Sequence, residues 1–155
     1  QAGEIVIKSD LVMKGYLDMP EATAETIKDG WLYTGDVAAI EEDCFIYIKD
    51  RIRDMIVTGG FNVFPSDVEA VLGQHPAIKE CVVFGLPDDK WGEAVQAAVE
   101  VHKGQTPGED EIIQYVKSRL DSVKAPKRVH FVDELPRSPV GKVLRREAKA
   151  QFQEA

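Results

Sequence analysis

The stretch DRIRDMIVTGGFNVFPSDVE at residues 50–69 is the part of this sequence that most constrains the fold. Its charged beginning leads into a short apolar run at residues 55–57, which predicts a buried strand. Gly59 and Gly60 break that strand, since glycine adopts backbone angles that other residues avoid. Pro65 then predicts a helix start, because a proline fits the first turn of a helix. This one stretch therefore predicts mixed α and β structure.

Apolar spacing in the rest of the chain extends this prediction to an α+β fold, a small layer of strands packed on helices. Alternating segments at 36–40 and 45–49 flank the acidic turn 41–43 and predict a hairpin. The polar segment 87–93 is expected to be a loop between two strands. The remaining expected strands lie at residues 4–8, 79–86, 94–101 and 128–132, and the expected helices at residues 21–28, 65–74 and 109–120.

The charge balance limits the partners of the chain. Its 155 residues carry 19 Lys and Arg against 27 Asp and Glu, a formal net charge of −8, which argues against a basic nucleic-acid-binding face. No apolar run approaches membrane-spanning length, and no signal peptide opens the sequence. Because Gln1 leads directly into a strand-like segment, we expect the chain to be a piece of a longer protein.

Cys44 and Cys81 lie among apolar neighbours, and neither belongs to a metal-ligand spacing. Such residues are typically buried, reduced thiols in a cytosolic protein. We therefore expect no metal site and a cytoplasmic location, with any membrane association supplied by regions outside this chain. His75, His102 and His130 are scattered, and no nucleophile pairs with them in an identifiable motif, so no catalytic triad is expected.

The loop PRSPVGKVLRR at residues 136–146 carries the strongest candidate for chemistry, Lys142. Its prolines stiffen the approach, and Gly141 permits backbone angles that other residues avoid. The flexible lysine that follows can place a point charge against an anion. Taken alone, the same basic segment is also typical of a solvated helix start.

Asp36 is the second candidate, at the end of the segment Thr34, Gly35, Asp36. A carboxylate that projects from a glycine-bearing turn is suited to accept two hydrogen bonds from the vicinal hydroxyls of a ribose. An aspartate that only caps the turn is the alternative interpretation.

Five segments, taken in order, resemble the adenylate-forming enzymes, the superfamily of acyl-CoA synthetases, peptide-synthetase adenylation domains and beetle luciferases. They are GEIVI at 3–7 with MKGY at 13–16, GWLYTGD at 30–36, the stretch 50–69 and the Lys142 loop. FNVFP followed by DVE, within 61–69, looks most like the fatty-acid–CoA ligase branch.

Enzymes of this superfamily are several times longer than this chain, and their phosphate-binding loop and acyl pocket have no counterpart here. The resemblance therefore implies a C-terminal lid domain at residues 51–155. Residues 1–50 would be the end of the large N-terminal domain, of which the expected hairpin is a remnant. The absent N-terminal domain is then the first expected partner, and a homo-oligomer is compatible with the sequence.

The implied reaction is the ATP-dependent adenylation of a small carboxylate, here a fatty acid, followed by thioester formation with coenzyme A. ATP, Mg²⁺ and coenzyme A are the implied cofactors, with Mg²⁺ on the phosphates and held mainly by the absent domain. We expect this chain alone to be inactive. An adenylation domain that delivers its acyl group to a carrier protein is one alternative, and a non-catalytic α+β interaction domain is another.

The resemblance also implies residue roles. Lys142 would bridge the attacking carboxylate and the phosphoryl oxygens, offsetting the charge that develops in the first step. Asp36 and Arg51 would bind the ribose of the nucleotide, although Arg51 could instead form a surface ion pair with Asp50 or Asp54.

Three positions near the domain boundary have implied roles as well. Arg53 occupies the hinge about which the lid turns, where Asp or Lys is the commoner residue. Gly59 and Gly60 would line the channel for the pantetheine arm of coenzyme A. Val57 stands where luciferases carry a lysine, which argues for thioester formation and against light emission.

Overall fold

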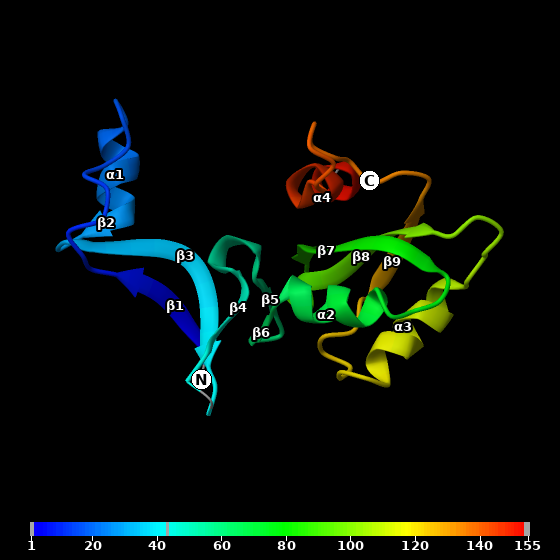
Figure 1. The fold of residues 1–155 in the computed structure, drawn as a ribbon. Coiled ribbons are helices and arrows are strands. Elements are labelled where there is room, and N and C mark those ends of the chain that lie inside the picture. The colour runs from blue at the N-terminus through cyan, green and yellow to red at the C-terminus, as the bar shows by residue number, and fades with distance from the viewer. Residues whose placement is uncertain (1, 43, 154–155) are drawn as a thin grey trace. The chain divides into compact units, whose positions relative to one another are not determined.

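The computed structural model describes residues 2–42 and 44–153. The chain divides into two compact units, Gln1–Arg53 and Asp54–Ala155, shown from blue to red in Figure 1. Each unit has its own sheet. The α+β fold class predicted from the sequence is confirmed.

The first unit is an antiparallel sheet built around one long central strand. This strand, β3 (Trp31–Ile40), pairs with β1 (Ala2–Ile7), β2 (Ile27–Lys28) and β4 (Ile46–Arg51). The short helix α1 (Pro20–Thr26) precedes β2. The pairing of β3 with β4 confirms the predicted hairpin; its turn residue 43 lies outside the described residues.

The first unit buries little of its apolar surface. Among its described residues, Val37 and Ala38 are the buried hydrophobic ones. Large side chains lie exposed in this sheet and just before β4, including Ile40, Phe45, Ile46 and Ile48 at 60–68% exposure. Apolar exposure on this scale is typical of a surface that packs against another element.

The second unit is a five-stranded sheet with helices on both faces. Its strands are β5 (Ile56–Thr58), β6 (Phe61–Val63), β7 (Ile78–Asp88), β8 (Gly92–Val101) and β9 (Arg128–Val132), and its helices are α2 (Pro65–Leu72), α3 (Glu109–Lys117) and α4 (Arg145–Gln153). The strands β6, β5, β8 and β7 follow one another by antiparallel pairing, and β9 pairs with β8 in parallel.

Alternation along β7 and β8 creates two cores. Val83, Ala97 and Val99 point to the core beneath α2 and α3, while Phe84 and Ala98 point to the core beneath α4. Successive residues of a strand face opposite sides of its sheet, so neighbours in sequence serve different helices. In Figure 1, α2 and α3 accordingly lie on one side of the sheet and α4 on the other.

Several element boundaries differ from the sequence prediction. The expected helix 21–28 ends at Thr26, because Ile27 pairs with Leu32 as a strand. The expected loop 87–93 shortens to residues 89–91, because β7 and β8 remain paired as far as Asp88 and Gly92. The strand β6 was not predicted, and Gly59 and Gly60 form the tight turn that joins it to β5.

The prediction of two buried thiols is wrong for Cys44, which is exposed. Cys44 lies in the connection between β3 and β4 with a φ of 63°, so its side chain does not belong to either face of the sheet. Cys81 is half-buried. Burial, together with the carboxylates of Glu69 and Glu80, raises the pKa of its thiol to about 12. None of the helices described here combines the length and the apolar character of a membrane crossing.

Glu100 is a charged residue inside the sheet of the second unit, with a side chain only 2% exposed. One carboxylate oxygen accepts hydrogen bonds from the Leu135 amide at 2.7 Å and from Arg137 Nη2 at 2.9 Å. The other accepts one from Lys79 Nζ at 2.7 Å. Burial by itself would raise the pKa of this carboxyl, but the three donors hold it below its usual value.

We expect this carboxylate to make stability depend on pH. Because its folded pKa lies below the unfolded one, its contribution is present above the unfolded pKa and is lost as pH falls through the folded pKa. Glu100→Gln should lower the free energy of unfolding at pH 7 by about 1–3 kcal/mol. Between about pH 5 and pH 3 the variant should lose less stability than the unmodified chain.

Urea unfolding followed by circular dichroism, at a series of pH values, measures both effects. The exposed Glu134 provides the matched control, since Glu134→Gln should leave the curve unchanged. Parallel stability curves for Glu100→Gln and the unmodified chain would contradict this prediction.

Candidate functional site

The loop that carries Lys142 is a closed turn. Arg137 and Val143 form an antiparallel bridge at its base. Inside it, the Ser138 amide donates to the Lys142 carbonyl at 2.8 Å, and the Gly141 amide donates to the Ser138 carbonyl at 2.8 Å. Gly141 has a φ of 82°, which a residue with a Cβ adopts only at a cost. The turn leaves the Lys142 side chain exposed.

Two arginines anchor the chain on either side of this loop. Arg137 binds the buried Glu100 on one side. On the other, Arg145 Nη1 donates to Asp54 Oδ2 at 2.9 Å, and its Nη2 donates to both oxygens of Glu69 at 2.9 and 3.0 Å. A fork of donors on a planar group gives such pairs a fixed geometry.

Glu69 connects Arg145 to strand β7 of the sheet. Its Oε1 also accepts a hydrogen bond from the Val83 amide at 2.8 Å. Glu100, Arg137 and Arg145 were not singled out by the sequence analysis. The available signal was a glutamate within the otherwise apolar end of the strand 94–101.

Gly59 and Gly60 occupy different surroundings within the turn between β5 and β6. A Cβ on Gly59 would lie 3.0 Å from Cε3 of Trp91, so this glycine sits against the indole ring. A Cβ on Gly60 would meet no atom within 4 Å. Gly60 therefore borders open space, and Gly59 does not.

The ammonium groups of two lysines lie over the indole ring of Trp91. Trp91 lies in the short connection between β7 and β8, and 36% of it is exposed. The Nζ atoms of Lys90 and Lys127 lie 4.9 and 5.5 Å from the centre of the indole ring. A partly exposed aromatic face with two ammonium groups can bind a planar ring and an attached anion.

In the first unit, Asp36 and Arg51 come together. They are register partners on β3 and β4, and Arg51 Nε lies 3.3 Å from Asp36 Oδ1. The Asp36 amide bonds to Thr34 Oγ1 at 3.1 Å, and the Gly35 amide bonds to Glu4 Oε1 at 2.9 Å. The alternative expected for Arg51 was an ion pair with Asp50 or Asp54, whereas the structure pairs its side chain with Asp36, another residue of the candidate site.

Arg53 lies in a short 3-10 turn, Ile52–Asp54, and is the last residue of the first unit. Its side chain is exposed. Between the two units the chain is therefore a single turn rather than a long linker.

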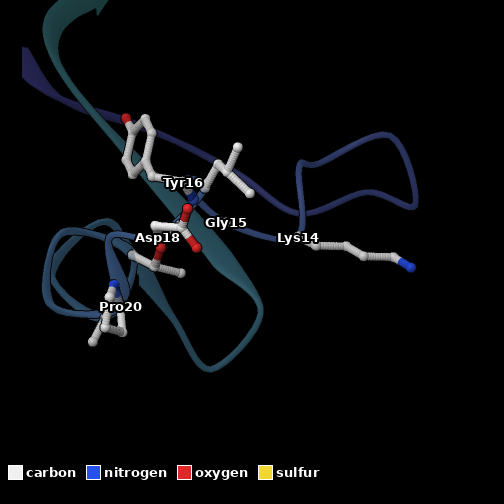
Figure 2. A pocket seen from close by; sticks show the side chains of 8 residues that line it. Lys14, Gly15, Tyr16, Asp18 and Pro20 are labelled. Atoms are coloured by element: carbon white, nitrogen blue, oxygen red, sulfur yellow. Dashed lines mark hydrogen bonds between the residues drawn. The ribbon is translucent and has the colours of Figure 1, made fainter.

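A hollow of about 540 Å³ lies elsewhere in the first unit. Figure 2 shows that Lys14 points away from the other labelled residues that line it, which include Tyr16 and Asp18. No residue of the candidate site lines this hollow. Within residues 2–42 and 44–153, no three His, Cys, Asp or Glu side chains are grouped so that they could hold a metal ion.

Comparison with known proteins identifies the family. Residues 67–142 match the AMP-binding enzyme C-terminal domain. The chain is 47% identical over 161 residues to a medium/long-chain-fatty-acid–CoA ligase, FadD8, of Mycobacterium tuberculosis, covering 99% of this chain and 28% of that protein. It is 46% identical over 149 residues to a 2-succinylbenzoate–CoA ligase of Geobacillus kaustophilus, covering 96% of this chain and 30% of that protein.

Solved structures agree with this assignment. The crystal structure of ATP-bound MatB from Rhodopseudomonas palustris superimposes with a TM-score of 0.91 at 36% identity, over 99% of this chain and 31% of that one. The chain thus spans about 30% of the length of the relatives that it matches. By sequence and by fold, this chain belongs to the adenylate-forming enzymes and contains their AMP-binding C-terminal domain.

Proposed function

We propose that this chain is the C-terminal portion of an AMP-forming fatty-acid–CoA ligase. The proposal rests on one observation: a hydrogen-bonded turn exposes Lys142 at the end of the matched AMP-binding enzyme C-terminal domain. The choice of a fatty acid as the substrate is supported by the FNVFP and DVE segments and by the similarity to FadD8. A relative of nearly equal sequence identity is a 2-succinylbenzoate–CoA ligase, so the identity of the acid is a more specific proposal than the reaction type.

In the first half-reaction Lys142 acts as a mobile positive charge. Its exposed amine contacts the attacking carboxylate and the phosphoryl oxygens of ATP, and it stabilises the negative charge that builds up there. Asp36 accepts hydrogen bonds from the ribose hydroxyls, and Arg51, whose Nε lies 3.3 Å from Asp36 Oδ1, orients that carboxylate. Mg²⁺ would be held by residues outside this chain and would offset the negative charge of the phosphates.

The exposed apolar sheet of the first unit supports this assignment. A sheet that leaves Ile40, Ile46 and Ile48 exposed needs further structure to cover it. We assign that role to the rest of a large N-terminal domain. Residues 1–50 then end that domain, and residues 51–155 form the lid. The isolated chain, which carries one wall of the active site, is expected to be inactive.

In the second half-reaction the lid turns about Arg53, and the glycine turn faces coenzyme A. The exposed side chain of Arg53 and its short 3-10 turn suit a hinge, because neither is held in the core of a unit. Gly60 leaves room for the pantetheine arm, since it borders open space. Gly59 lies against Trp91 in the same turn and remains part of the proposed channel wall.

The surroundings of Trp91 favour coenzyme A over a carrier protein as the acceptor. The partly exposed indole and the ammonium groups of Lys90 and Lys127 suit the adenine ring of coenzyme A and the phosphate groups on its ribose. The phosphopantetheine arm of a carrier protein presents neither an adenine ring nor a 3′-phosphate.

The role of Lys142 is tested by measuring the two half-reactions separately in the complete enzyme. Lys142→Ala should lower the adenylation rate about a hundredfold or more, comparable to the loss of one preorganised donor. Thioester formation from pre-made acyl-adenylate should persist. Lys103→Ala, at another exposed lysine, is the control and should leave both rates unchanged. An unchanged adenylation rate in Lys142→Ala would contradict the catalytic role and support the alternative that this loop is only a solvated helix start.

The channel is tested with a pair of glycine variants. Gly60→Leu should block thioester formation and leave adenylation near normal, because the added side chain obstructs the second step only. Gly60 has a φ of 82°, so any side chain also strains the backbone. Gly104→Leu controls for that strain, since Gly104 has a φ of 84° and equally open surroundings. Equal losses in both half-reactions of Gly60→Leu would show a folding glycine.

The acceptor is tested by comparing coenzyme A with 3′-dephospho-coenzyme A. Lys127→Ala should raise the KM for coenzyme A about tenfold, as expected for one charge-assisted hydrogen bond. The KM for the dephosphorylated analogue should change less. If both KM values stay unchanged and a carrier protein accepts the acyl group efficiently, the carrier-dependent alternative replaces this assignment.

A further inference from the structure

Arg137 contacts both the interior of the second unit and the loop of Lys142. Its Nη2 donates to Glu100 Oε1 at 2.9 Å and also to Glu80. Its Nη1 donates to the Gly141 carbonyl at 3.3 Å. That carbonyl belongs to the peptide bond whose nitrogen is the amide of Lys142. The guanidinium therefore links a buried carboxylate of β8 to the peptide that immediately precedes Lys142.

The strength of this link comes from the burial of Glu100. A carboxylate that is 2% exposed has little water to compete for its hydrogen bonds, so the position of its partner is tightly defined. Lys79 and the Leu135 amide hold the same carboxylate from other directions. The position of the Glu100 carboxylate is therefore fixed, and its hydrogen bond to Arg137 fixes the position of the guanidinium.

The planar fork of arginine suits this task. One nitrogen of the guanidinium meets the two carboxylates while the other reaches the Gly141 carbonyl, and the plane of the group fixes the angle between them. A lysine has one nitrogen on a flexible stem, so it can keep the charge pair but cannot hold the two directions at once.

We propose that Arg137 is a positioning residue for Lys142 in the adenylation step. It acts through the Gly141 peptide and does not itself touch substrate. Holding the loop in place matters because a displacement of about 1 Å at a catalytic group can cost about a hundredfold in rate. This inference rests on the proposed role of Lys142 in adenylation.

The test uses Arg137→Lys in the complete enzyme, because this variant keeps a charge beside Glu100. The kcat for adenylation should fall about tenfold or more, while the KM values for ATP and the acid change less than about threefold. Thioester formation from pre-made acyl-adenylate should stay within about twofold of normal. Arg119→Lys, at an exposed arginine that bonds to Tyr115, is the matched control and should leave all three unchanged.

A double variant separates positioning from general loss of structure. If Arg137 works through Lys142, then Arg137→Lys combined with Lys142→Ala should adenylate no more slowly than Lys142→Ala alone. Additive losses, or an equal fall in both half-reactions, would overturn the inference. If Arg137→Lys fails to fold, Glu80→Gln replaces it, since Glu80 is 38% exposed and its loss strands no buried charge. A smaller fall confined to adenylation is then expected, and no fall would overturn the inference.

The outcomes also separate this inference from the proposed function. An adenylation rate that is unchanged in Lys142→Ala removes the proposed function, whatever Arg137→Lys does. A large fall in Lys142→Ala with no change in Arg137→Lys keeps the function and rejects the positioning role alone.

Discussion

The antiparallel pairing of β7 with β8 is the constraint on which the second unit depends. The two strands stay in register from Ile78 to Asp88, apart from one shift near residue 79. Because their side chains alternate, this one pair supplies both cores, the one beneath α2 and α3 and the one beneath α4. The same strands place Glu80 and Glu100 near the loop of Lys142. Packing and the candidate chemistry therefore share one framework.

A buried charge within that framework gives the exposed turn of Lys142 a fixed point of attachment. Burying a carboxylate is costly unless every lone pair finds a donor, and Glu100 meets an amide, a lysine and an arginine. Apolar packing could hold the sheet but has no directional preference. Hydrogen bonds do have one, so they can carry an orientation from the core to an exposed turn. Arg145, bound to Asp54 and Glu69, does the same on the far side of the loop.

The two units differ in how completely they bury their apolar residues. Among the described residues, the larger core of the second unit has thirteen buried residues, which include Val83, Val95 and Ile112. The first unit has a sheet whose apolar residues remain exposed. This contrast supports the proposal that the chain holds a lid domain and the end of a larger N-terminal domain. The 3-10 turn that contains Arg53 is the point in the chain where the first unit ends and the second begins.

The sequence by itself determined the α+β class, the hairpin of β3 and β4, most strands of the second unit and the exposed lysine turn. These features follow from local rules, namely period-2 alternation, glycine at positive φ and proline at helix starts. Local rules failed for Ile27 and for the strand β6, because both became strands only by pairing with a neighbour. The burial of Glu100, its bond to Arg137 and the different surroundings of Gly59 and Gly60 were decided by tertiary structure alone. Each depends on residues brought together from distant positions, and the pattern around a residue does not record what will pack against it.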